Sequence, residues 1–578
     1  MNKNIFSKIG DKWREITTPN FDNPELRKKK DFSRFIVYII PAAFLCIFLF
    51  YPLFTTLIRA FMSASKGKYD FSTLGFDGFI KLFNSGMFRK SLRNSFVVSV
   101  SVTFLTILIG VPMGYFVARV DIPGKKMIKS LGLLPIIMPA FIGAFSWIIL
   151  LGNQGSLRLV LSKIGIGVPS IYGISGIIFV MTMVYYPFVF LLAEGAFGSA
   201  NAQLEDSAML MGASRGRILR TITLPLIVPS IGAAALLVFI RSIGNFGIPS
   251  ILGKDQYVLP TLIYFKINGF WDLNGASSIA LVNVTITALV LYLQKKIVSR
   301  HDYETVSAAR TEIKQADNKI VKIIATVFCW LILIVSLLPQ ITIIIMSFFT
   351  EWTGPLPTGF TFGNYSMIPS NSNREFLNSI YLSVVATILA AVLGSLIAYV
   401  TGRIKPKGGA ILDMAIMAPF ILPGTVVSVA LISSFGTLIG GTYTIIIISF
   451  IIRRTPYVYR SVSASLTQMN PSLEEASTIA GGNWFYTFKK VTIPIIMPGI
   501  ISGSLLTFTT LLQELSTTIL LYSAKTRTVP VQIYGAVVDG ALGQASALSV
   551  ILLVIVFILV YISNNSNKAN ISAGLKLS

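Results

Sequence analysis

The chain has 578 residues, of which 53% are hydrophobic and only 12% are charged, and its mean hydropathy is +0.73. A soluble domain carries about 25% charged residues, so this composition excludes an ordinary soluble protein and indicates the lipid bilayer. The net charge of +24 would also suit a nucleic-acid-binding protein. However, the lysines and arginines form short clusters between apolar runs, as in loops that face anionic lipid. We therefore expect membrane lipid, and no nucleic acid, among the partners.

Cysteine and histidine are too scarce for a disulfide framework or a His-rich metal site. Cys46 and Cys329 both lie in apolar runs, and His301 is the only histidine. No resident cofactor is expected from these residues. The charged N-terminal residues lead into a long apolar run without a small-residue cleavage site, which predicts an uncleaved first span.

Apolar runs long enough to cross a bilayer, about 20 residues each, recur along the whole chain. They predict an all-α polytopic membrane protein with about twelve transmembrane helices. Glycine or proline interrupts the third, fourth and tenth runs. The runs lie near residues 33–60, 93–119, 129–152, 171–195, 224–244, 279–298, 320–348, 378–402, 410–434, 441–462, 494–521 and 543–563.

The spans fall into two halves, 33–298 and 320–563, with a polar linker at 299–319 between them. A basic N-terminal tail, 1–32, and a C-terminal tail, 564–578, flank the halves. Loops rich in lysine and arginine face the cytoplasm in most membrane proteins. The basic loops of this chain predict that the linker and both termini are cytoplasmic, in a multi-pass protein of a bacterial cell membrane.

One polar and basic segment between spans occurs twice at a constant distance. Its first copy contains an acid, two small residues, a glycine and a proline, and the second copy contains the same pattern 269 residues later. The first copy is Asp206-Ser207-Ala208, Gly212 and Pro225, and the second is Glu475-Ala476-Ser477, Gly481 and Pro494. Each copy predicts a short helix that begins near the acid and ends at the glycine. The alternative is a plain helical connection between spans.

The duplication extends into the spans, where the distance between matching residues is 284. The matching pairs are Asn94-Ser95 with Asn378-Ser379, Gly110 with Gly394, Arg119 with Arg403, and Pro135 and Pro139 with Pro419 and Pro423. Two halves with six spans each have the same orientation, so they predict parallel repeats with a pathway at their interface.

The repeated segments resemble the cytoplasmic EAA motif, E-A-A-x3-G-x9-I-x-L-P, of permease subunits in binding-protein-dependent ABC importers. The first copy departs from the motif at Asp206 and Ser207, and the second at Ser477 and Val491. The resemblance implies the type I ABC importer permease fold, with alternating access. It also implies that both segments dock separate ATPase subunits and that an extracytoplasmic binding protein delivers the substrate.

The chain has no ATP-binding motif of its own. No G-x4-G-K-[ST] sequence is present, and Gly67-Lys68, Gly124-Lys125 and Gly253-Lys254 lack the required spacing. We therefore expect a permease without enzymatic activity, with ATP and Mg²⁺ bound in two partner subunits.

Two permease halves in one polypeptide are similar to the ferric-iron, thiamine and aminoethylphosphonate importers. The Glu514-Leu515-Ser516 stretch with Thr518 resembles the ferric-iron permeases most closely. The resemblance implies ferric iron as substrate, with thiamine or aminoethylphosphonate as alternatives. A rival class is an ion-coupled secondary carrier, which predicts buried acids in the spans and no polar docking loop.

Three polar residues of the fifth and eleventh predicted spans are candidates for the translocation pathway. Asn245 and Glu514 are 269 residues apart and are therefore equivalent, and Arg241 is a candidate counter-ion one helical turn before Asn245. Ionisable groups inside spans face a cavity or a partner. Glu514 is thus a candidate transient ligand of a hard cation such as Fe³⁺, although no metal site is certain. The alternative is a polar pair that only holds helices together.

Overall fold

The computed structural model describes residues 38–62, 71–199, 202–298, 319–352, 354–368, 372–404 and 408–575. This part of the chain is almost entirely helical. A short antiparallel pair of strands, β1 (Phe349–Glu351) and β2 (Thr358–Phe360), is the exception. The predicted tail 1–32 and nearly all of the predicted linker 299–319 lie outside the described residues.

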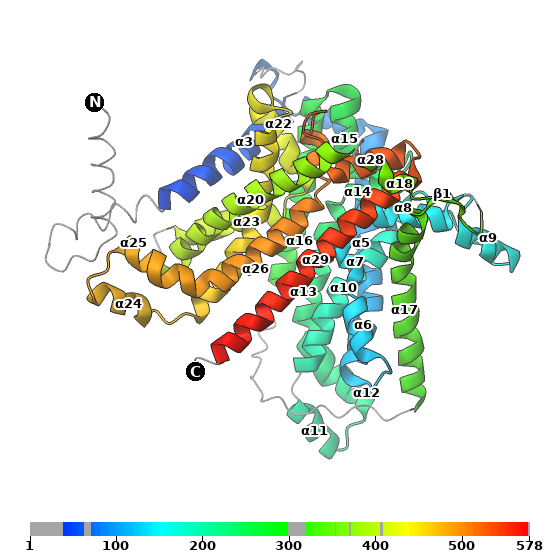
Figure 1. The fold of residues 1–578 in the computed structure, drawn as a ribbon, viewed down its shortest axis with the longest axis horizontal. Helices are drawn as coiled ribbons and strands as arrows, with labels where there is room; N and C mark the ends of the chain where they lie inside the picture. Colours follow the sequence, from blue (N-terminus) through cyan, green and yellow to red (C-terminus); the bar gives the residue numbers. More distant parts are fainter. Residues whose placement is uncertain are drawn as a thin grey trace.

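The first half begins with a span and ends with a span, and short helices join the longer ones (Figure 1). Its elements are η1 (Cys46–Phe50), α3 (Tyr51–Ala60), η2 (Phe71–Thr73), α4 (Asp77–Asn84), α5 (Gly86–Arg119), α6 (Lys125–Leu131), α7 (Leu134–Ile137), α8 (Ala140–Leu151), α9 (Ser156–Lys163), α10 (Ile174–Ser199), α11 (Ala202–Leu210), α12 (Arg215–Ile218), η3 (Leu219–Thr223), α13 (Leu224–Ile243), α14 (Gly247–Leu252), α15 (Leu259–Phe270) and α16 (Leu273–Val298).

The second half has a similar order, and the two strands follow its first helix. Its elements are α17 (Lys319–Met346), α18 (Gly363–Ser366), α20 (Asn373–Tyr399), η4 (Val400–Ile404), α21 (Gly409–Met417), η5 (Ala418–Phe420), α22 (Gly424–Ile439), α23 (Tyr443–Gln468), α24 (Ser472–Ile479), α25 (Trp484–Thr487), η6 (Phe488–Thr492), α26 (Ile493–Leu512), α27 (Thr518–Leu521), α28 (Val529–Val538) and α29 (Leu542–Leu575). The last helix continues into the predicted tail 564–578.

Ten helical stretches of the described residues are long and apolar enough to cross a membrane, and one bent pair makes an eleventh. The predicted number was about twelve. The remaining helix is α23, which has 26 residues and matches the predicted span 441–462 in position. It differs from the others because three arginines, Arg453, Arg454 and Arg460, lie in its central part rather than near its ends.

The predicted helix breaks are confirmed for the third span but not for the fourth and tenth. The third and ninth predicted spans are broken at Pro139 and Pro423. These prolines have extended backbone and directly precede α8 and α22. The helical stretch formed by α21 and η5 meets α22 at an angle of 109°. The fourth and tenth are the continuous helices α10 and α23, although Pro187 and Pro456 lie inside them. A proline within a span is tolerated where neighbouring groups satisfy the freed carbonyl, so proline alone does not locate a break.

The duplicated Asn-Ser pairs perform the same task in both halves. Asn94 donates a hydrogen bond to the carbonyl of Tyr257 (3.0 Å), and Asn378 donates to the carbonyl of Arg527 (2.8 Å). The adjoining serine hydroxyls accept from the first backbone N–H groups of α15 and α28, at 2.7 and 2.8 Å. Each pair therefore holds a short helix against the second span of its own half, which supports the predicted internal duplication.

The duplicated glycines allow the closest approach of two spans. A Cβ atom on Gly110 would lie 2.8 Å from the backbone nitrogen of Phe190 in α10, and one on Gly394 would lie 3.0 Å from that of Tyr459 in α23. Both contacts are with backbone, which cannot rotate away. Small residues at such positions let transmembrane helices pack by van der Waals contact.

Gly110→Ala is expected to lower the free energy of unfolding by about 1–3 kcal/mol, because the added methyl group overlaps the backbone of α10. Gly195→Ala is the matched control, since Gly195 is exposed on α10 and a Cβ there meets nothing within 4 Å. The control should gain up to about 1 kcal/mol from helix propensity. Thermal unfolding of both variants in detergent measures the difference, and equal unfolding temperatures would contradict this packing.

The two halves exchange their first spans. α3 packs against α16 of its own half and α22 of the other, while α17 packs against α8, α5 and α6 of the first half. The exchange includes an ion pair between Lys322 and Asp121 (2.8 Å) and a hydrogen bond between Tyr186 and Ser336 (3.0 Å). Figure 1 shows the halves converging near α14, α15, α22 and α28 and diverging towards α11 and α24. We call these the far end and the loop end of the molecule.

Candidate functional site

Both repeated segments fold into a short helix that stops at a left-handed glycine. α11 ends before Gly212 (φ +84°), and α24 ends before Gly481 (φ +86°). The next N–H groups, of Ala213 and Gly482, bond to carbonyls of the last helical turn at 3.0 and 2.8 Å. This is the hydrogen-bond pattern of a helix end that requires glycine. Pro225 and Pro494 then lie in the first turns of α13 and α26, where a missing N–H is tolerated.

The predicted motif residues differ in their exposure. Asp206 and Glu475 are exposed, and neither forms an ion pair within the described part of the chain. Ser477 is half-buried, and its hydroxyl lies 2.8 Å from that of Thr487. Ser207 and Ala476 are exposed, and Ala208 is half-buried. The acids of the motif are therefore free to contact another molecule.

A different acid attaches the first segment to the spans. Glu205 accepts two hydrogen bonds from Arg119, at 2.9 and 3.0 Å, and one from Thr223, at 2.8 Å. Arg119 ends the second span, and Thr223 lies directly before α13. Because a bidentate guanidinium–carboxylate pair fixes orientation as well as distance, this triad couples the direction of α11 to two spans.

The second segment has the same triad in equivalent residues. Glu474 pairs with Arg403 (3.2 Å) and accepts from Thr492 (2.6 Å), and Arg403 also donates to the carbonyl of Met469 (2.8 Å). Glu474 and Thr492 follow Glu205 and Thr223 by 269 residues. Sequence reasoning missed these acids although they adjoin Asp206 and Glu475. The available signal was the pair of consecutive acids in both copies.

Both segments present large apolar side chains to solvent, and the first also exposes Met211 (89%). Leu210 is 90% exposed and Ile479 is 86% exposed, and these residues are also 269 positions apart. Isolated exposed apolar residues are common on protein surfaces. Two at equivalent positions, each two residues before the left-handed glycine, form a repeated surface that suits a partner with an apolar groove.

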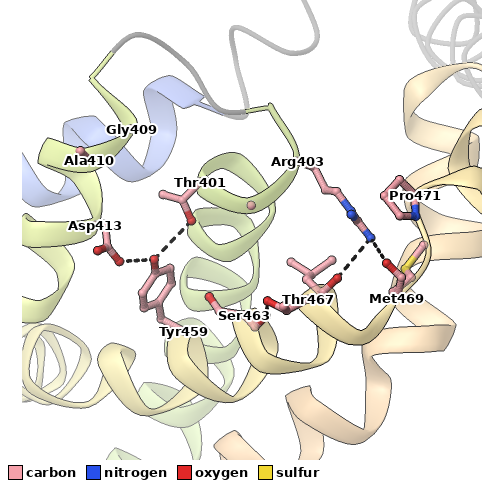
Figure 2. A pocket seen from close by; sticks show the side chains of 12 residues that line it. Thr401, Arg403, Gly409, Ala410, Asp413, Tyr459, Ser463, Thr467, Met469 and Pro471 are labelled. Atoms are coloured by element: carbon pink, nitrogen blue, oxygen red, sulfur yellow. Dashed lines mark hydrogen bonds between the residues drawn. The ribbon is translucent and has the colours of Figure 1, made fainter. Parts of the chain in front are cut away.

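A cavity of about 660 Å³ lies beside the second segment. Figure 2 shows Tyr459 between Asp413 and Thr401. The hydroxyl of Tyr459 donates a hydrogen bond to the carboxylate of Asp413 and lies 3.3 Å from the hydroxyl of Thr401. Arg403 points away from them, towards Met469 and the start of α24.

The equivalent region of the first half has different residues. There the residues matching Asp413, Tyr459 and Ser463 are Lys129, Phe190 and Glu194, and Lys129 forms an ion pair with Glu194. The two halves therefore differ at the loop end even though their triads are the same.

The second cluster of functional residues lies where α26 ends and α27 begins, against α23. Glu514 is 6% exposed and forms ion pairs with both Arg453 and Arg454 of α23. Arg453 also donates to the hydroxyl of Thr517 (2.7 Å), and the backbone N–H of Thr517 donates to Glu514 (3.2 Å). The predicted counter-ion Arg241 was therefore wrong, because Arg453 and Arg454 take that role. Their signal was two adjacent arginines near the middle of the predicted span 441–462.

Asn245 repeats this arrangement without charge. Its amide donates to the hydroxyl of Tyr185 (2.6 Å) and accepts from the backbone N–H of Ile248 (2.9 Å). Tyr185 matches Arg454 in the duplication. Neither Asn245 nor Glu514 lies within a span as predicted, since α13 ends at Ile243 and α26 at Leu512. Each instead follows a span and holds the start of a short helix, α14 or α27.

Arg241 lies between the two halves rather than against Glu514. Its guanidinium carbon is 4.6 Å from the ring centre of Phe188 in α10, and its charge lies near the side chain of Tyr457 in α23. Phe188 and Tyr457 are equivalent residues of the two halves. Arg241 is exposed, and no carboxylate within the described residues forms an ion pair with it.

Among the described residues, Glu514 is not part of a group of acids that could form a metal site. No group of three or more His, Cys, Asp or Glu residues that could hold a metal ion occurs among the described residues. Both carboxylate oxygens of Glu514 accept bonds from arginines. Ligation of a cation by Glu514 would therefore require one of these ion pairs to open.

Comparisons with known proteins agree with this architecture. The model of the family described as binding-protein-dependent transport system inner membrane component matches residues 87–302 and 394–568. The ferric transport system permease protein FbpB of Actinobacillus pleuropneumoniae is 27% identical, over 91% of this chain and 78% of that protein. The putative ferric transport system permease protein FbpB 1 of Haemophilus influenzae is also 27% identical, over 86% of this chain and 79% of its own length.

Two further similarities cover about a third to a half of the chain. The molybdenum transport system permease protein ModB of Mycobacterium bovis is 29% identical over 35% of this chain and 77% of that protein. A solved bacterial ABC transporter that imports the polysaccharide alginate is 23% identical, with a TM-score of 0.40 over 48% of this chain and 100% of its own. The family model covers more than half of the 578 residues in two copies. The chain therefore belongs to the inner membrane components of binding-protein-dependent transport systems, as a fused two-domain permease of the ABC importer class.

Proposed function

We propose that this chain is the permease through which an ATP-driven importer moves ferric iron into the cytoplasm. An extracytoplasmic binding protein delivers the iron, and two separate ATPase subunits supply the energy. The ferric substrate is supported by two relatives named as ferric transport permeases, which match this chain over 91% and 86% of its length.

The repeated surface at the loop end carries the proposal of ATPase coupling. Asp206 to Gly212 and Glu475 to Gly481 each combine an exposed acid, an exposed apolar side chain and a left-handed turn. An exposed acid and an apolar anchor in the last turn suit a partner groove with basic and apolar walls. The triads of Glu205 and Glu474 would pass any displacement of these segments to the spans.

Alternating access is supported by the unequal closure of the two ends. At the far end the halves touch, with the rings of Phe246 and Tyr534 6.0 Å apart and the prolyl ring of Pro423 beside Gly244. At the loop end the halves diverge (Figure 1). If the loop end is cytoplasmic, this conformation is closed outwards and open inwards. ATP-driven approach of α11 and α24 would then reverse the closure.

Uptake of radiolabelled ferric iron tests the proposal in cells that express the full transporter. We expect the wild-type chain to support uptake that stops when ATP is depleted. Leu210→Asp combined with Ile479→Asp should reduce uptake at least tenfold, since a loss of 1–3 kcal/mol of coupling corresponds to about 5–150-fold.

Leu438→Asp is the control, because Leu438 is also strongly exposed but lies at the end of α22, at the far end. The control should leave uptake near wild type. Uptake that continues without ATP would identify a secondary carrier. ATP-driven uptake of another substrate, with no uptake of ferric iron, would refute ferric iron as the substrate.

A further inference from the structure

The charges around Glu514 do not balance. Arg453 and Arg454 share the one carboxylate of Glu514, and the charge of Arg241 lies near Tyr457, beside Arg454. Three guanidinium charges against one carboxylate leave a local charge of +2. A charged group within the spans is costly unless it has a partner or a role in the pathway, so the excess requires an explanation.

Hydrogen-bond donors are in excess as well. The Nε atoms of Arg453 and Arg454 are buried, and neither has a hydrogen-bond partner among the described residues. A neutral arrangement would have been sufficient to hold the helices, because the first half has Tyr185 in place of Arg454 and Asn245 in place of Glu514. The charged version in the second half therefore adds something beyond packing.

Arg241 presents this excess charge to the space between the halves. It is exposed, it lies over the ring of Phe188 in the first half, and its charge lies near Tyr457 in the second. The contact of Gly244 with Pro423 lies three residues further along the chain, towards the far end. Arg241 thus lies next to the closed far end, on the side that faces the loop end. A transported species would pass this point before it is released.

We propose that the space beside Arg241 binds an oxyanion, so that iron crosses as an oxyanion-ligated ferric complex rather than as a bare trivalent cation. This inference rests on the proposed function for the identity of the metal. A guanidinium binds carboxylate and phosphate oxygens with paired hydrogen bonds, which no amine or amide reproduces. A bare cation would instead meet a net positive field at this point of its path.

Binding to the purified full-length chain in detergent tests the proposal without any ATPase. The probes are inorganic phosphate, citrate, ferric citrate and the inert trivalent cation hexaamminecobalt(III). Wild-type protein should bind the oxyanion probes and should not bind hexaamminecobalt(III). Arg241→Gln should weaken oxyanion binding roughly tenfold or more, because the complex loses one charge-assisted hydrogen bond.

Two further variants keep the test decisive. Arg460→Gln removes an exposed arginine from the same helix that holds Arg453, but Arg460 contacts Met417 and should leave binding unchanged. Arg241→Glu should abolish oxyanion binding and admit hexaamminecobalt(III). Oxyanion binding that survives both Arg241 substitutions, or wild-type binding of hexaamminecobalt(III), would overturn the proposal.

The probes also separate the sources of the oxyanion. Tighter binding of ferric citrate than of citrate would support transport of the ferric complex. Tighter binding of free phosphate or citrate would refute the claim that the bound oxyanion carries iron. Failure of ATP-driven iron uptake would count against the proposed function alone, because binding to the purified chain does not depend on it.

Discussion

Glu514→Ala is expected to abolish transport and to lower the free energy of unfolding by about 3–5 kcal/mol, the cost of breaking a buried ion pair from one side. The loss is large because one carboxylate serves two buried guanidinium groups, Arg453 and Arg454, and also holds the start of α27 through Thr517. Thermal unfolding in detergent and uptake in cells measure the two effects. Normal transport by a well-expressed Glu514→Ala variant would exclude Glu514 from the pathway.

Asn245→Ala is the matched control for this substitution. It removes the equivalent side chain of the first half, where only neutral hydrogen bonds are lost, so we expect a decrease of about 1–3 kcal/mol. An equal loss of stability in the two variants would show that the charge of Glu514 is unimportant.

A triple variant separates a pathway role from simple adhesion between helices. Replacing Arg453, Arg454 and Glu514 together with leucine removes every charge of the buried group while filling its volume. Apolar replacement of a whole buried ion pair is often neutral or stabilising. We expect this variant to fold but to transport poorly. Full transport by the triple variant would favour the alternative that the group only holds helices together.

Arg403→Ala is expected to uncouple the second segment from the spans. Without Arg403, α24 keeps its exposed surface but loses the bond between Glu474 and the end of the second span of its half. We expect the ATPase subunits still to bind, while uptake per ATP hydrolysed falls roughly five- to 150-fold, the range of a 1–3 kcal/mol coupling energy. Arg119→Ala should have the same effect in the first half.

Thr467→Ala provides the control, since Thr467 lines the same cavity but its hydroxyl bonds only to the backbone of its own helix. That variant should keep the wild-type ratio of uptake to hydrolysis. If Arg403→Ala also keeps this ratio, the triad does not transmit the movement of α24.

The duplication was the part of the structure that the sequence predicted best. Residues spaced by 269 and 284 positions, such as Asn94 and Asn378, make the same contacts in both halves. The spacing is informative because each pair satisfies backbone groups of a fixed structural unit. The breaks in the spans were harder to predict. Pro139 and Pro187 look alike in the sequence, and only the surrounding helices decide which of them ends a helix.

The buried charges could be recognised only in part from the sequence. Glu514 is an acid in an apolar run and was a candidate, but its partners Arg453 and Arg454 are some 60 residues earlier on another helix. Their proximity depends on how α23 packs against α26, which periodicity does not specify. Glu205 and Glu474 were overlooked because the family motif directs attention to the acids that follow them.

The central claim, that two equivalent segments hold the ATPase subunits, is tested most directly by site-specific cross-linking. Leu210→Cys and Ile479→Cys, introduced separately after Cys46→Ser removes the exposed native thiol, place one reactive group on each segment. Leu438→Cys at the far end serves as the control. The account predicts cross-links to an ATPase subunit from both segments and none from residue 438. Absence of cross-links from both segments in an assembled, active transporter would contradict it.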